Sequence, residues 1–284
     1  MIWAYLAILG RIILLGYEKI VVKKVGENND SMATSFLFFA LAILFLFPFV
    51  FLDKIPKNLE FLPYGLTSSF IYSLSFFLYV KSLSLGEASL VGPLYNFNVF
   101  FLLLLTTIFL GEAFTINKLI GLSLLVYGAS FLNRQENVFK SLKILIKKKE
   151  SFLMILSSLL IAIGRTIDGF LMGKISALFY TFFLYFAISV FQFLYLLIGK
   201  KLREVAKVFK NNTLYVFIAS AINAYSYLLL LIAFKKVPVS IAEPLSMLSM
   251  ILTVIFAHYL LKENIGLRIV GVLIMILGSF ILFL

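Results

Sequence analysis

The stretch VSIAEPLSMLSMILTVIFAHYLLKE, residues 239–263, decides the fold of this chain. It is apolar and long enough to form a helix that crosses a lipid bilayer, which takes about 20 residues. A second stretch, ASLVGPLYNFNVFFLLLLTTIFLGE, residues 88–112, has the same plan, with a proline 19 residues before a terminal glutamate. We therefore interpret the two stretches as copies of one membrane helix. The residues that mark the repeat, for which we expect a structural role, are Pro93, Glu112, Pro244 and Glu263.

The composition is that of a protein built from membrane helices. Of the 284 residues, 62% are hydrophobic and 13% are charged, and the mean hydropathy is +1.07. A soluble protein of this length needs far more polar surface. A β-barrel is excluded because its strands would alternate polar and apolar residues over about 10 positions. The absence of cysteine excludes disulfides, thiolate metal sites and cysteine nucleophiles.

Apolar runs separated by short polar breaks predict ten transmembrane helices. They divide into a first repeat over residues 1–133 and a second over residues 151–284, with five helices in each. Because five is an odd number, the second copy is inverted in the membrane relative to the first, as in many secondary transporters. The expected fold class is an all-α integral membrane protein with two inverted five-helix repeats. The expected helices span residues 3–22, 34–52, 62–83, 89–110, 118–132, 151–172, 177–198, 214–234, 240–261 and 267–284.

The segment NRQENVFKSLKILIKKKE, residues 133–150, joins the two repeats. Its apolar residues recur at helical spacing between lysines, so we expect residues 134–150 to form a basic amphipathic linker on the membrane surface. Much of the net charge of +12 lies here and in a second basic stretch, residues 199–212. Membrane lipids are therefore expected partners, and nucleic acid is not. The first 19 residues lack a basic leader and a small-residue cleavage site, so we expect a retained helix.

Two glycine pairs extend the repeat beyond the duplicated helix. Each pair has a spacing of seven residues, which places small residues on one helix face for close packing. Together with the motifs at 85–112 and 237–263, they give the chain a resemblance to the drug/metabolite transporter superfamily, in its ten-helix branch with two EamA-type repeats. The chain departs from the family pattern where Lys262 replaces a common glycine, and where Leu-Gly replaces Trp-Gly in the first helix. The glycine pairs are Gly121 with Gly128 and Gly271 with Gly278.

The resemblance implies a carrier of small organic metabolites, often one that moves amino acids or drugs outward without hydrolysing a nucleotide. It implies no cofactor and no metal, and it places both termini in the cytoplasm. The distribution of charge points the other way. Lys and Arg are concentrated in the loops that follow the odd-numbered helices, and the positive-inside rule would put both termini outside.

Ionisable side chains inside a membrane span are costly and mark candidate functional positions. Arg165 and Asp168 are three residues apart on one helix face and can pair. Either this pair is structural, or Arg165 lines a cavity and binds a carboxylate or phosphate. Arg11 holds the matching place in the first repeat, where it either does the same or snorkels to the membrane surface. The candidates for an ion pair or for proton coupling are Asp168, Arg11 and His258, although a lone histidine is more often a packing residue.

Glu243 has no acidic counterpart in the first copy, where Gly92 stands. It either stabilises a helix N-terminus electrostatically, or it binds a substrate ammonium or a coupling proton at a cavity mouth. Glu112 and Glu263 are expected to stabilise the start of the helix that follows each of them. Glu18 lies near the end of the first helix, and we expect it at the membrane interface.

Uncharged polar side chains gather on four helices that are equivalent across the repeats. Each pair of such groups could simply form an interhelical hydrogen bond, worth about 0.6 kcal/mol. Their concentration on repeat-related helices indicates a shared central cavity instead. The substrate-binding candidates are Arg165, Glu243, Asn96, Tyr95, Asn223, Tyr227, Tyr72 and Ser246.

The function predicted is secondary transport of a small organic metabolite, as an exporter or exchanger in the cell membrane, by alternating access around a cavity between the repeats. No obligate protein partner is expected. A flippase for a lipid-linked head group is an alternative within the same fold. A membrane-embedded enzyme is disfavoured because no two aspartates are close and no HExxH or Walker A motif is present.

Overall fold

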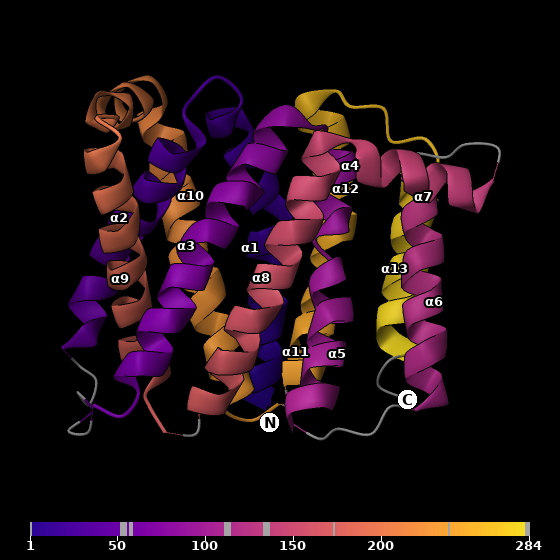
Figure 1. Cartoon of the computed structure of the whole chain (residues 1–284), viewed down its shortest axis with the longest axis horizontal. Helices are drawn as coiled ribbons and strands as arrows, with labels where there is room; N and C mark the ends of the chain where they lie inside the picture. Colours follow the sequence, from indigo (N-terminus) through magenta and orange to yellow (C-terminus); the bar gives the residue numbers. More distant parts are fainter. Residues whose placement is uncertain are drawn as a thin grey trace.

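The computed structural model describes residues 2–51, 56, 59–110, 115–132, 137–172, 174–237 and 239–281, which form helices and no strand. The helices run roughly parallel as one bundle, with both ends of the chain at the same side (Figure 1). This agrees with an even number of spans, and the predicted fold class is confirmed. The helices are α1 (Ile2–Gly26), α2 (Ser31–Val50), α3 (Leu62–Leu85), α4 (Ala88–Leu94), α5 (Phe97–Leu110), α6 (Ile116–Ser130), α7 (Val138–Lys147), α8 (Lys149–Leu171), α9 (Ala177–Ile198), α10 (Leu202–Phe234), α11 (Val239–Ser246), α12 (Ser249–Leu261) and α13 (Arg268–Ile281).

Five helical segments are long and apolar enough by themselves to cross a membrane: α2, the α4–α5 segment, α8, α9 and α10. The helix α1 is long enough but is too rich in charged residues to be counted among them. The helix α1 carries charged side chains along its length, yet most of these are buried in the bundle. A membrane helix can carry such groups when they face the protein interior instead of lipid.

The two repeats pack against each other reciprocally. The first helix of each repeat packs on the third helix of the other, which pairs α1 with α10 and α8 with α3. The second helices, α2 and α9, pack together, as do the last helices, α6 and α13. In the α6–α13 contact, a Cβ on Gly278 would lie 2.7 Å from the carbonyl oxygen of Gly121, and one on Gly271 would lie 2.7 Å from that of Gly128. The glycine pairs therefore serve the close packing predicted for them.

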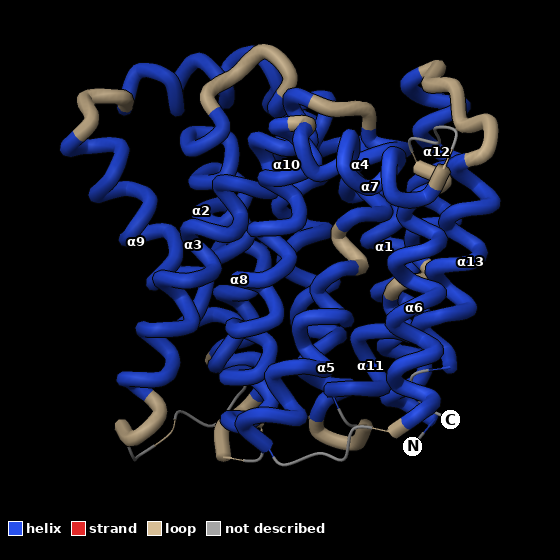
Figure 2. Tube along the Cα trace, turned by 45° about the vertical axis from the view of Figure 1, so that its right-hand side comes forward, coloured by secondary structure: helices blue, strands red, loops and turns tan. Residues whose placement is uncertain are grey.

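Two helices predicted to be continuous are interrupted near their middle. The expected helix 89–110 is divided into α4 and α5 at Tyr95 and Asn96, and the expected helix 240–261 into α11 and α12 at Met247 and Leu248. At each interruption the backbone closes a tighter turn, since Tyr95 N donates to the carbonyl three residues earlier, as does Leu248 N. The interruptions are short tan stretches midway along the bundle in Figure 2. In transporters, discontinuous helices of this kind border the substrate site.

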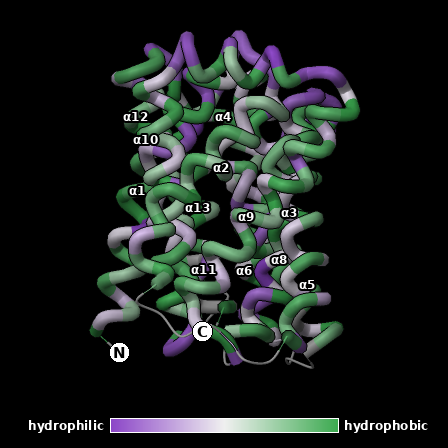
Figure 3. The backbone as a smooth tube through the Cα atoms, turned by 90° about the vertical axis from the view of Figure 1, so that its left-hand side faces the viewer, coloured by the Kyte–Doolittle hydropathy of each residue, from purple (hydrophilic) through white to green (hydrophobic). Residues whose placement is uncertain are grey.

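One end of the bundle is more polar than the other. Figure 3 shows hydrophilic residues gathered at the end opposite the termini. The amphipathic helix α7 lies across this end (Figure 1), within the segment predicted as a linker. The helix α10 also begins there, twelve residues earlier than predicted, so the basic stretch at 202–211 is helical and joins the span through a kink at Asn212. The prediction of a loop here was wrong because the stretch has strong helix formers.

Candidate functional site

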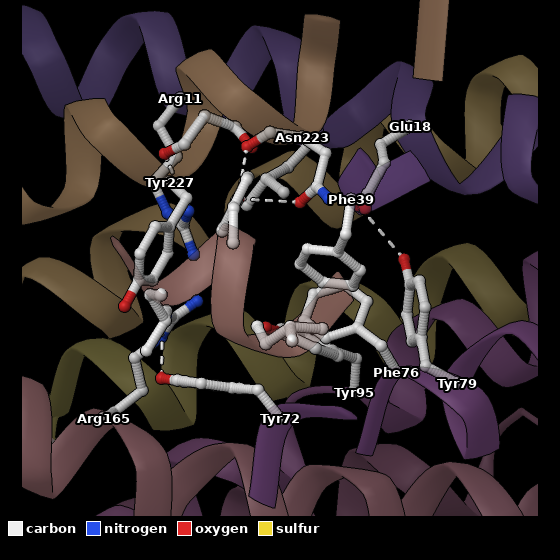
Figure 4. Close-up of a pocket in the computed structure, with 15 residues that line it drawn as sticks. Arg11, Glu18, Phe39, Tyr72, Phe76, Tyr79, Tyr95, Arg165, Asn223 and Tyr227 are labelled. Atoms are coloured by element: carbon white, nitrogen blue, oxygen red, sulfur yellow. Dashed lines mark hydrogen bonds between the residues drawn. The ribbon is translucent and has the colours of Figure 1, made fainter. Parts of the chain in front are cut away.

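A small cavity lies at the centre of the bundle, between the two repeats (Figure 4). Its volume of about 20 Å³ is enough for a single water molecule. Side chains from α1, α2, α3, α8, α9 and α10 line it, and Tyr95 reaches it from the turn between α4 and α5. The lining residues are Arg11, Leu15, Glu18, Phe39, Tyr72, Phe76, Tyr79, Tyr95, Arg165, Leu184, Tyr185, Ile188, Asn223, Ser226 and Tyr227.

Two buried arginines, one from each repeat, face this cavity. Arg11 on α1 donates from Nε to the Ser246 hydroxyl at 3.0 Å and from Nη1 to the Ser226 carbonyl at 2.9 Å. Because α1 begins at the membrane surface, the sequence also allowed Arg11 to snorkel there. The structure instead buries its whole side chain. An arginine buried in a span needs such partners. Ser246, a substrate-binding candidate from the sequence, lies beside the cavity, where it accepts the hydrogen bond from Arg11, and does not line it.

Arg165 on α8 is held by aromatic side chains. Its Nη1 donates to the Tyr72 hydroxyl at 3.0 Å, and its guanidinium carbon lies 4.7 Å from the ring centre of Tyr227 and 5.4 Å from that of Tyr72. Cation–π contacts of this type stabilise a desolvated guanidinium. The two tyrosines thus orient the charge of Arg165 toward the cavity.

Asp168 lies one turn further along α8, and both of its carboxylate oxygens accept hydrogen bonds. Its Oδ2 accepts from the hydroxyls of Tyr72 at 2.6 Å and Tyr227 at 2.7 Å, and its Oδ1 accepts from Tyr180 at 2.8 Å and Ser68 at 3.2 Å. Arg165 Nη1 lies 3.5 Å away. Three helices besides α8 supply these donors, so Asp168 fastens the elements of the site together and does not itself line the cavity.

Glu243 on α11 lies between the two arginines. Its Oε1 is 2.5 Å from Arg165 Nε, and its Oε2 is 3.6 Å from Arg11 Nη2. None of these four atoms makes a hydrogen bond of acceptable geometry, although all are buried. The contacts are therefore ion pairs held by proximity, without the aligned hydrogen bonds that Asp168 has.

Glu18 does not lie at the interface as predicted, and neither does the neighbouring Lys19. Both are buried in the bundle. Glu18 lines the cavity and accepts a hydrogen bond from the Tyr79 hydroxyl at 3.1 Å, while Lys19 Nζ lies 5.2 Å from the ring centre of Tyr95. The sequence contained one signal of this, since Glu18 follows Arg11 by seven residues and so shares its helix face.

The remaining candidates divide between the cavity and its surroundings. Asn223 lines the cavity, and Tyr185 donates to both its backbone and side-chain oxygens. Asn96 is buried at the α4–α5 turn outside the cavity lining, and both of its side-chain polar atoms lack a hydrogen-bond partner. His258 is exposed at the end of α12, where its Nδ1 contacts the Glu263 carbonyl. Tyr79 and Tyr185 are lining residues that no sequence pattern singled out.

Glu263 stabilises a different helix from the one expected. Its two carboxylate oxygens accept hydrogen bonds from the backbone amides of Ala88 at 2.9 Å and Ser89 at 2.8 Å. These are unpaired donors at the start of α4, so Glu263 caps a helix of the opposite repeat and not α13. Pro93 lies buried within α4. Glu112 and the side chain of Pro244 lie outside the described residues.

Comparison with known proteins identifies the family of this chain. The sequence matches the EamA-like transporter family twice, over residues 2–134 and 148–284. The chain belongs to the EamA-like transporter family. This EamA-like chain is thus a multi-pass membrane transporter of the drug/metabolite type.

The structural comparison gives the fold alone. A crystal structure of another protein superposes on this EamA-like transporter with a TM-score of 0.62, covering 98% of this chain and 95% of that chain at 12% sequence identity. No curated protein sequence matches closely enough to establish a relationship. The residues of the site are therefore interpreted from their own geometry.

Proposed function

We propose that this protein is a secondary transporter, an exporter or exchanger in the cell membrane, for a small organic metabolite that carries a carboxylate. The observation that carries the proposal is the placement of Arg11 and Arg165, one from each repeat, on a single buried cavity. Guanidinium groups bind carboxylates through paired hydrogen bonds. Arg11 Nη2 and Arg165 Nε lack an aligned hydrogen-bond acceptor and contact only Glu243 as ion-pair partner, so a solute carboxylate that displaces Glu243 would gain both donors.

The small volume of the cavity supports alternating access. A volume of about 20 Å³ holds one water molecule and no organic solute. A solute can therefore enter only if helices of the two repeats separate on one side. The α1–α10 contact of one repeat has its counterpart in the α8–α3 contact of the other. Equivalent helix movements could therefore open the cavity toward either side of the membrane.

The proposal contains no chemical step on the solute. The carboxylates nearest the arginines are Asp168, which accepts four hydroxyl donors, and Glu243, which is enclosed by two guanidiniums. Neither is placed as a free general base toward the cavity. The partners proposed are the solute and membrane lipids.

Counterflow in proteoliposomes tests the proposal. Purified protein is reconstituted into vesicles loaded with unlabelled carboxylates, including amino acids, and uptake of the labelled counterpart is followed. We expect accumulation for at least one carboxylate, and at least a 10-fold loss of rate in R165K, because lysine cannot reproduce the guanidinium fork. R203K changes an exposed arginine in the same way and should behave as wild type. The absence of counterflow for every solute, or equal rates in R165K and R203K, would contradict the proposal.

A further inference from the structure

We infer that the cavity has two poles of opposite charge, and that it selects a zwitterion whose cationic and anionic groups lie at opposite ends of an apolar spacer. The anion would bind at Arg11 and Arg165, and the cation at Glu18. This inference rests on the proposed function and adds a substrate class to it.

The separation follows from the geometry of α1. Arg11 and Glu18 are seven residues apart, which is close to two full turns, so both face the cavity they line. Two turns rise about 10.5 Å along the helix axis. Arg11 and Glu18 therefore reach the cavity from different turns of one helix, so a solute that contacts both carries its two charges at separate ends.

Glu18 is prepared to accept a cation. Tyr79 donates a hydrogen bond to Oε2, and among the described residues no cationic nitrogen lies within 4 Å of the carboxylate. The Nζ of the neighbouring Lys19 lies 5.2 Å from the ring centre of Tyr95, and it attracts Glu18 electrostatically without forming an ion pair with it. A buried carboxylate without an ion-pair partner is costly, and an ammonium group on the solute would supply the partner.

Aromatic rings beside Glu18 suit the same cation. The ring centre of Tyr79 lies 5.7 Å from that of Phe76 and 5.8 Å from that of Tyr95, and all three residues line the cavity. Lys19 Nζ already lies over the Tyr95 ring. The rings of Tyr79 and Phe76 therefore remain to attract a solute ammonium through cation–π contacts. This observation is independent of the ion-pair argument and places the cationic pole at the same point.

The wall of the cavity between the poles suits an apolar spacer. Phe39 packs edge-on against Phe76 at 4.8 Å and against Tyr185 at 4.9 Å between ring centres. Methylene groups would bury surface against these rings at about 25 cal/mol per Å². A short ω-amino acid such as 5-aminovalerate carries its charges at the ends of such a spacer, whereas in glycine they are attached to one carbon.

Competition against counterflow tests the inference in the proteoliposomes described above. The competitors are glycine, 4-aminobutyrate, 5-aminovalerate, 6-aminohexanoate, pentanoate and pentylamine. With wild type, we expect 4-aminobutyrate or 5-aminovalerate to inhibit at a concentration at least 10-fold lower than pentanoate or glycine. E18Q should remove this advantage, so that the ω-amino acids and pentanoate inhibit at similar concentrations. E204Q, which alters a partly exposed glutamate paired with Lys207, should keep the wild-type order.

Two results would overturn the inference while leaving the proposed function intact. The first is that neither 4-aminobutyrate nor 5-aminovalerate inhibits wild type better than pentanoate, and the second is an unchanged preference in E18Q. Failure of counterflow with every carboxylate would instead contradict the proposed function itself. If E18Q does not fold, E18D decides. Its shorter side chain should move the best competitor toward the longer 6-aminohexanoate, and an unmoved optimum would count against the inference.

Discussion

Arg165 Nε and Glu243 Oε1 lie 2.5 Å apart in the centre of the bundle, yet neither atom makes an aligned hydrogen bond. Arg11 approaches the other oxygen of the same carboxylate at 3.6 Å. The first repeat has Gly92 at the position of Glu243, so the shared scaffold does not require an acid here. If the two arginines bind a solute carboxylate as proposed, we expect Glu243 to compete with it for both guanidiniums.

Replacing Glu243 by glutamine should strengthen binding of a carboxylate solute. The neutral amide no longer occupies Arg11 and Arg165 electrostatically, so we expect the half-saturating concentration in counterflow to fall about 5-fold, or about 1 kcal/mol. E27Q, which changes an exposed glutamate, should leave this concentration unchanged. A rise in the half-saturating concentration of E243Q would show that Glu243 contributes to binding instead of competing with it.

Replacing Asp168 by asparagine should mainly reduce stability. The carboxylate accepts from Tyr72, Tyr180, Tyr227 and Ser68 and lies beside Arg165. Removing one partner of a buried ion pair costs about 3 kcal/mol, and an amide nitrogen cannot accept two hydroxyl donors. Thermal unfolding in detergent should show a larger decrease in midpoint for D168N than for E243Q.

The control for Asp168 is Y180F, which removes one donor of the four. Its expected cost is about 1 kcal/mol, so its midpoint should lie between those of wild type and D168N. A midpoint of D168N within a degree of wild type would mean that the four hydroxyl contacts do not hold the site together.

Replacing Glu263 by glutamine should loosen the start of α4. The charged carboxylate caps the amides of Ala88 and Ser89 across the repeat boundary, and loss of such a cap costs about 1 kcal/mol. Hydrogen exchange followed by mass spectrometry should become faster for the peptide containing these amides. E87Q alters the neighbouring half-exposed glutamate that pairs with Arg268 and should change this exchange much less. Unaltered exchange in E263Q would rule out the capping role.

Acid should weaken a contact between the repeats at the polar end of the bundle. Burial raises the pKa of Asp30, but hydrogen bonds from Lys201 and from the amides of Ala33 and Met32 outweigh it, so the pKa falls below the ordinary value of 3.8. A lowered pKa contributes stability above the unfolded-state value, and that stability is lost as pH falls through the folded-state value. We expect the unfolding temperature of wild type to decrease below about pH 4.

D30N provides the comparison, because it cannot titrate. Its unfolding temperature should be lower than that of wild type at pH 7, and the difference should shrink as the pH is lowered toward 3. Parallel curves for the two proteins over this range would show that Asp30 carries none of the acid sensitivity.

Much of the scaffold followed from sequence spacing. A proline 19 residues before a glutamate in two places, with glycine pairs behind each, indicated two copies of one five-helix unit. The same comparison separated Glu243 from the shared residues, since copy one has a glycine there. Helical spacing also put Arg165 and Asp168 on one face, where the structure finds them paired. These features depend on residues close in the chain or on direct comparison of the copies.

Other features were decided by contacts between distant helices. Glu18 and Tyr79 meet 61 residues apart, and Glu263 reaches Ala88 across 175 residues. Asn96, a reasonable cavity candidate, lies buried outside the lining. The sequence by itself determined the repeat, the membrane-helix class and the helix face on which each charge lies, but not the breaks in two helices or the early start of α10. Only the tertiary structure decided which of these faces meet, because helix periodicity fixes the direction of a side chain on its own helix and carries no information on which helix of the other repeat packs against it.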